Sequence, residues 1–181
     1  MPGFAKRVIG LLLNTHEGTL LPALRIVGNI SSGTEKQTDH LLNNGIFPIL
    51  EELLTHPKKT VRRESCWTIS NIAASPSRQL NQLLDQKSLL RKVSTLFLND
   101  DLLVRKEICY VFSNMSQLGD RERVMEVYRE HEVIEGVVYM ICQDQNHNCI
   151  EVGLQALFQM LNMGQRMSRV NPVYAIATRI P

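Results

Sequence analysis

Two short columns of side chains carry the residue types that recognise a peptide. Each column holds a carboxylate, an aromatic ring and an amide at positions i, i+3 and i+7, which lie on one face of a helix. An Asn amide can donate and accept hydrogen bonds with a peptide backbone, and a ring face attracts a cation by about 0.5–2 kcal/mol. The columns therefore predict a site for an extended, Lys/Arg-rich peptide. They are Glu64, Trp67, Asn71 and Glu107, Tyr110, Asn114.

A packing role for the same residues stays open at the level of sequence. Trp67 and Tyr110 could be buried in the core, with the Asn side chains bonding a neighbouring loop. The core stripe of the same helix is better assigned to Cys66, Ile69 and Ala73, also at i, i+3 and i+7. Stacked repeats place successive helices roughly 10 Å apart, which would turn the two columns into ladders of rings and amides. We therefore favour binding over packing.

The elements that must position these columns belong to a repeated phrase. Residues Val61–Ile72 recur as Val104–Met115, shifted by 43 positions. Fainter copies lie 42 residues upstream, at Pro22–Ile30, and 45 residues downstream, at Val152–Met160. A period in the low forties with helical units is typical of armadillo and HEAT solenoids.

Apolar spacing divides each unit into three helices. A mostly apolar segment precedes each phrase, at residues 4–13, 46–55, 89–98 and 134–143. A more polar, outer segment precedes that one, at residues 35–44, 78–86 and 121–132. Three helices per unit favour armadillo over the two-helix HEAT or tetratricopeptide repeat. We expect an all-α armadillo-repeat solenoid, wound as a right-handed superhelix.

The same spacing sets the expected repeat boundaries. Turns that contain Gly or Pro separate the units, because these residues end helices. The chain enters at the second helix of a unit, so we expect a piece of a longer protein. The expected units are a partial repeat at 1–33, full repeats at 34–75, 76–119 and 120–164, and a truncated repeat or disordered tail at 165–181.

Composition limits the functional classes. The 181 residues are 44% hydrophobic and 21% charged with a net charge of +2, which allows a continuous core and gives no reason to expect nucleic-acid binding. Neither a membrane-spanning run nor a secretory leader is present, so we expect a soluble, intracellular protein. Four cysteines without CxxC spacing suggest buried, reduced thiols rather than zinc or disulfides.

Catalytic motifs are missing. The sequence contains no GxGxxG, Walker loop, HExxH or GxSxG, and its five histidines have no shared spacing. We therefore expect a protein that is not an enzyme and that holds no metal or other cofactor.

Several stretches resemble the importin-α family, the armadillo adaptors for nuclear-localisation signals. The similarity covers about residues 4–164 and follows the order of that family's sixth and seventh repeats. It is carried by Pro-Ala-Leu-Arg-Ile-Val-Gly-Asn-Ile at 22–30, Gly-Thr-Glu-Lys-Gln-Thr at 33–38, His-Pro-Lys-Lys at 56–59 and Glu-Ser-Cys-Trp-Thr-Ile-Ser-Asn-Ile at 64–72.

The resemblance implies that this chain carries the family's minor signal-binding groove. In the family, Trp and Asn on third helices form that groove, and an Arg replaces Trp in the sixth repeat. A lysine pocket beside a Gly-Thr turn belongs to it, together with acidic residues. The matching positions are Arg25 with Asn29, Trp67 with Asn71, Tyr110 with Asn114, the pocket residues Gly33, Glu35, Thr38 and Asn71, and the acidic residues Glu64 and Glu107.

The sequence also departs from the family. Tyr110 takes the place of Trp, and Gln155 and Gln159 replace Trp and Asn in the last unit, so the ladder should end there. Nothing matches the family's importin-β-binding arm or its major groove.

The resemblance implies a function and partners. It implies a monomeric nuclear-import adaptor in the cytoplasm and nucleus, with importin-β and an export receptor as partners of the full-length protein only. No nucleic acid or membrane is expected as a partner. An armadillo scaffold or regulatory subunit for a non-transport protein is the alternative; such proteins commonly bind acidic partners through basic grooves.

Overall fold

The computed structural model describes residues 3–143 and 146–180, and every regular element in these two ranges is a helix. The expected all-α class is thus confirmed. The ends expected for the apolar and polar segments agree to within two residues, whereas the helices that contain the repeated phrase extend up to five residues beyond it. One reason for a shift is Glu132, whose φ of 52° ends α9 earlier than expected. The helices are α1 (Phe4–Leu11), α2 (Glu17–Ser31), α3 (Glu35–Asn43), α4 (Ile46–Leu53), α5 (Lys59–Ala73), α6 (Ser77–Leu84), α7 (Lys87–Asn99), α8 (Leu102–Leu118), α9 (Arg121–Glu130), α10 (Val133–Gln143), α11 (His147–Gln165) and α12 (Pro172–Ala177).

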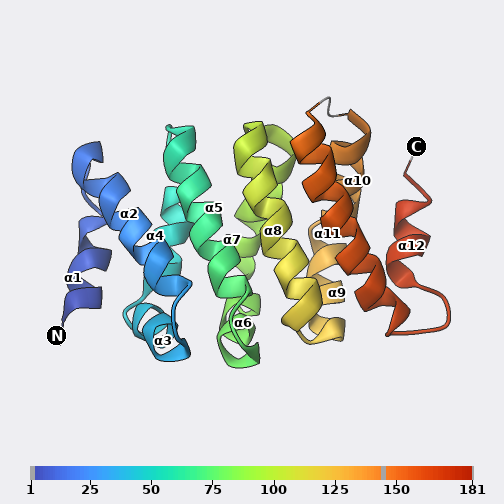
Figure 1. Cartoon of the computed structure of the whole chain (residues 1–181), viewed down its shortest axis with the longest axis horizontal. Helices are drawn as coiled ribbons and strands as arrows, with labels where there is room; N and C mark the ends of the chain where they lie inside the picture. The colour runs from blue at the N-terminus through green and yellow to red at the C-terminus, as the bar shows by residue number, and fades with distance from the viewer. Residues whose placement is uncertain (1–2, 144–145, 181) are drawn as a thin grey trace.

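The helices form a solenoid of three-helix units. The long helices α2, α5, α8 and α11 lie side by side in one layer, in chain order (Figure 1). Helices α4, α7 and α10 lie behind them, and the short helices α3, α6 and α9 follow one another along the lower edge of the stack. Each long helix thus packs on the long helix of the next unit, as the repeated phrase predicts.

One hydrophobic core runs through the stack. Cys66, Ile69 and Ala73 are all fully buried, which confirms the expected core stripe of α5. The core is continuous from Val8 in α1 to Val173 in α12. Because each unit buries its apolar face only against its neighbours, the stability of the stack depends on the junctions between units.

Ion pairs reinforce these junctions. The Arg62 guanidinium on α5 donates through Nε and Nη2 to the two carboxylate oxygens of Asp100, both at 2.6 Å. Its Nη1 also donates to the carbonyl oxygens of His56 and Pro57. A planar guanidinium that bonds a carboxylate at two points fixes the relative orientation of the two groups as well as the distance between them. The Arg62–Asp100 pair therefore restrains the rotation of one repeat unit relative to the next.

The cysteines are free thiols. Cys66, Cys109 and Cys149 are buried as expected, whereas Cys142 is exposed, so the expectation of a buried thiol was wrong there. Cys142 follows the last buried residue of α10, Met140, and lies one residue from the end of that helix. Burial raises the pKa of the Cys66 and Cys109 thiols, which keeps them protonated and unreactive.

The described part of the tail contains a packed helix. Asn171 caps α12, because its Oδ1 accepts hydrogen bonds from the backbone amides of Val173 and Tyr174. Its Nδ2 donates to the carbonyl oxygen of Leu161 at 2.8 Å, which ties the cap to α11. The described part of the tail thus contains a capped helix that is bonded to α11, and the assignment of 165–181 to a truncated repeat stays a prediction.

At Gly136, α10 packs tightly on α7. A Cβ at this position would lie 2.3 Å from Cδ1 of Phe97, and the Phe97 ring is itself buried. We predict that Gly136→Ala lowers the free energy of unfolding by about 1–3 kcal/mol, because the ring has no room to move.

Gly10→Ala provides the matched control in urea denaturation. Gly10 lies inside α1 with no atom within 4 Å of an added Cβ, so alanine should stabilise the protein by up to about 1 kcal/mol. Equal effects of the two substitutions would contradict the described packing of α10 on α7.

Candidate functional site

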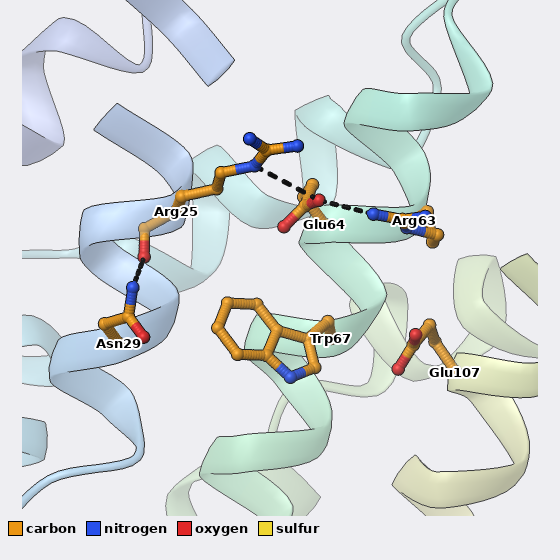
Figure 2. A pocket seen from close by; sticks show the side chains of 6 residues that line it. All are labelled: Arg25, Asn29, Arg63, Glu64, Trp67 and Glu107. Carbon is orange, nitrogen blue, oxygen red and sulfur yellow. Dashed lines mark hydrogen bonds and ion pairs between the residues drawn. The ribbon is translucent and has the colours of Figure 1, made fainter. Parts of the chain in front are cut away.

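A pocket opens where α2, α5 and α8 lie side by side (Figure 2). This pocket, called the Trp67 pocket below, has a volume of about 390 Å³. The structure brings together five of the residues expected at the site, from all three helices, and adds a sixth that sequence reasoning missed. They are Arg25 and Asn29 from α2, Glu64 and Trp67 from α5, Glu107 from α8, and the unexpected Arg63.

Trp67 lies against the backbone of α2. A Cβ on Gly28 would lie 2.2 Å from Cζ3 and 2.7 Å from Cε3 of the indole, so only glycine allows the ring to sit there. The ring is half-buried and also lines the pocket. One part of the indole therefore holds two repeats together while another part remains available to a ligand.

The Asn side chains connect successive long helices. Asn71 Nδ2 donates to the carbonyl oxygen of Gly28, and Asn114 Nδ2 donates to that of Ser70, both at 3.0 Å. Asn29 instead donates within its own helix, to Arg25 O. No other hydrogen bond of the Asn71 amide is found in the described ranges, so its second N–H and its Oδ1 remain available. The Asn71 and Asn114 side chains therefore link successive repeats, and Asn71 still has hydrogen-bonding groups that a ligand could use.

Glu64 is not the open acidic residue that the sequence suggested. Its side chain is only 8% exposed, and its Oε1 accepts from Arg63 Nη2 at 2.7 Å and from Arg25 Nε at 3.4 Å. Figure 2 shows the two guanidinium groups reaching the carboxylate from opposite sides. The expectation that Glu64 directly attracts a ligand cation therefore needs correction, because internal cations already neutralise it.

Glu107 is the carboxylate that remains available. Across the described residues it makes no ion pair, and in Figure 2 it lies beside Trp67 at the α8 side of the pocket. Burial raises the pKa of the Glu107 carboxyl above its ordinary value, while Arg63 and Lys106 partly oppose this rise. A cation bound here would replace the solvation that burial has removed.

A second pocket, of about 430 Å³ and called the Glu35 pocket below, adjoins the C-terminal end of α5. Gly33, Glu35, Thr38 and Asn71 all line it, so the four positions implied by the resemblance do converge. Thr38, however, is 1% exposed and its hydroxyl donates to Ser31 O. The threonine hydroxyl is thus occupied by the chain itself, and the exposed Glu35 carboxylate is the group open to a ligand.

The third ladder position is more open. Tyr110 is 37% exposed on α8 and is not among the residues that line the Trp67 pocket. On α11, Gln155 bonds Glu151 in its own helix. No described bond runs from Gln159 to α8, so the Asn ladder ends at Asn114 as expected.

The remaining chemistry of the chain is sparse. The described residues contain no group of three His, Cys, Asp or Glu side chains that could bind a metal ion. Every described helix falls short of the length and apolar character that crossing a membrane requires.

Comparisons with known proteins agree with this architecture. Residues 34–74 match the family described as Armadillo/beta-catenin-like repeat. Importin subunit alpha-1a of Oryza sativa subsp. japonica is 40% identical over 84 residues, covering 46% of this chain and 16% of the relative. Importin subunit alpha-4 of Arabidopsis thaliana is 32% identical over 164 residues, covering 90% of this chain and 30% of the relative. The resemblance to the importin-α family is thus confirmed, and the chain spans less than a third of these two relatives.

Solved structures show the same fold. An engineered protein superposes with a TM-score of 0.84 at 21% identity, over 97% of this chain and 69% of its own. A designed armadillo repeat protein, solved in complex with the peptide (KR)4, superposes with a TM-score of 0.81 at 21% identity, over 97% and 80%. At this identity the likeness establishes the armadillo solenoid.

Glu107 makes the stability of the protein depend on pH. Because burial raises its folded-state pKa, ionisation of the carboxyl weakens the folded state as the pH rises through that value. We predict that Glu107→Gln matches the wild type in urea denaturation below about pH 4, where both side chains are neutral, and is more stable at neutral pH. A variant that is less stable at neutral pH would show that the ionised carboxylate is held favourably.

Proposed function

We propose that this chain, whose armadillo repeats are related in sequence to those of importin α subunits, binds extended Lys/Arg-rich peptides of the nuclear-localisation-signal type. The observation that carries the proposal is one pocket that joins the half-exposed ring of Trp67 to the available carboxyl of Glu107. An aliphatic stem ending in a cation matches both groups at once. The stem packs on the ring, and the charge reaches the carboxyl.

The Asn ladder supports a peptide backbone beside this pocket. Trp67 and Asn71 lie about one turn apart on α5, so the Trp67 pocket and the Glu35 pocket are reached from one stretch of helix. The amide groups of Asn71 left over from the Gly28 bond can pair with an extended backbone. A ligand that spans both pockets places one basic side chain at Glu107 and another at Glu35.

The comparisons support the same ligand class. Two relatives are named as importin α subunits, and a structural neighbour was solved with the alternating Lys/Arg peptide (KR)4. By extension, the whole protein would be an import adaptor without its own catalytic activity, working in cytoplasm and nucleus. Importin-β and an export receptor would be partners of the full-length protein only, and the chain itself would be a monomer.

A second candidate is a scaffold that binds an acidic, non-transport partner. The observation in its favour is Arg25, whose side chain is 62% exposed and whose Nη1 and Nη2 make no bond in the described ranges. An acidic peptide of equal length is therefore the control ligand in every titration below, and tighter binding of the acidic peptide would favour this candidate.

Trp67 should carry much of the affinity for a basic peptide. We predict that Trp67→Ala weakens binding of a fluorescent lysine-rich peptide by about 1–2 kcal/mol, because the cation and its stem lose the ring. Fluorescence anisotropy measures the change. Tyr139→Ala is the control, because Tyr139 is 49% exposed on α10 and lines neither pocket. Unchanged affinity of a folded Trp67→Ala variant would contradict the proposal.

Asn71 should matter more than Asn114. We predict that Asn71→Ala costs about 1–3 kcal/mol of peptide affinity, because hydrogen bonds to a partly desolvated backbone are lost. Asn114→Ala should cost less, since Asn114 does not line the Glu35 pocket. The two variants are matched controls, because each also loses one inter-repeat bond of 3.0 Å. An equal or reversed order would rule out this placement of the peptide.

A further inference from the structure

Arg63 holds a position that the proposed function does not explain. Its Nη2 donates to Glu64 Oε1 at 2.7 Å, and its side chain is 35% exposed at the pocket wall. In Figure 2 the Arg63 guanidinium reaches Glu64 from the side opposite Arg25, and Glu107, the other carboxylate of the pocket, lies below it on α8. A cation that belongs to the chain thus holds the Glu64 oxygen that a ligand cation would otherwise bind.

The charges of the pocket cancel in this state. The lining contains two guanidinium groups, Arg25 and Arg63, and two carboxylates, Glu64 and Glu107. In this state Glu64 Oε1 is bonded by both cations, which keeps it from a ligand, and Arg63 also partly opposes the rise in the pKa of Glu107 that burial causes. A basic peptide therefore meets a neutral pocket with one available carboxyl.

The contact of Arg63 is suited to release. In the described ranges, its only side-chain hydrogen bond is the single bond to Glu64. Its neighbour Arg62 instead holds Asp100 at two points and two carbonyl oxygens besides. A single-point contact made by a partly exposed guanidinium is exchanged more readily than the two-point contact of Arg62 with its additional bonds. If the Arg63 side chain rotated away from Glu64, the Glu64 Oε1 atom could accept a hydrogen bond from another cation.

We infer that Arg63 is an internal counter-cation that competes with the ligand for Glu64 and thereby sets the affinity of the groove for basic peptides. This inference rests on the proposed function. With Arg63 in place, the pocket takes one cationic side chain, at Glu107. A peptide with two neighbouring basic side chains can displace Arg63 and use both carboxylates, so the groove selects ligands by the density of their positive charge.

The test compares Arg63→Gln with Arg91→Gln at fixed ionic strength. Both changes remove one positive charge, but Arg91 lies on α7 with its side chain 71% exposed, 4.0 Å from Glu130 and away from the pocket. We expect Arg63→Gln to lower the Kd for a lysine-rich peptide about three- to tenfold and Arg91→Gln to change it less than about twofold, because charge acts most strongly at short range. Arg63→Met keeps the aliphatic stem and should bind the peptide as Arg63→Gln does. Agreement between the two variants shows that the change in Kd does not come from a folding defect in one of them.

Each outcome decides the inference. A Kd that is unchanged or raised in both Arg63 variants overturns it, while peptide binding by the wild type leaves the proposed function standing. Binding by the Arg63 variants but not by the wild type supports it. Folded wild type and variants that all fail to bind the peptide overturn the inference and the proposed function together.

Discussion

The spacing between α2 and α5 is set at a single backbone position, Gly28. The Asn71 amide donates to its carbonyl oxygen at 3.0 Å, and the Trp67 indole lies where a Cβ would otherwise stand. The same bond recurs one unit later, from Asn114 to Ser70 O. The residues that could bind a peptide are therefore also the residues that join the repeats, so the groove has its shape before any ligand arrives. A preformed groove reduces the ordering cost of binding.

Electrostatics of the groove are more balanced than a count of its carboxylates suggests. Glu64 is held by Arg25 and Arg63 and so serves to position those arginines. Glu107 is partly desolvated and has a raised pKa, which makes it the group that gains most from an incoming cation. On the inferred role of Arg63, affinity for a basic peptide would depend on how easily this internal cation leaves, as well as on how many acidic residues are present.

Much of this architecture was predictable from the sequence, because a phrase that recurs after 43 residues indicates both the helices and their stacking. The columns at Trp67 and Asn71 followed from helical spacing alone. The contact of Arg63 with Glu64 did not follow from helical spacing, because adjacent residues on a helix do not face one another. Only the length of the Arg63 side chain lets its guanidinium reach Glu64. The burial of Glu64 and the inward hydroxyl of Thr38 depend on how close the neighbouring helices come, which a sequence pattern does not specify.

The indole N–H of Trp67 offers the most direct test of a basic-peptide groove. Trp67 is the only tryptophan of the 181 residues, so a proton–nitrogen correlation spectrum contains one indole cross-peak, and that peak reports on one pocket. Titration with a lysine-rich peptide should move this cross-peak progressively to saturation, and an acidic peptide of equal length should leave it in place. A cross-peak that ignores the basic peptide, or that responds only to the acidic one, would contradict the account.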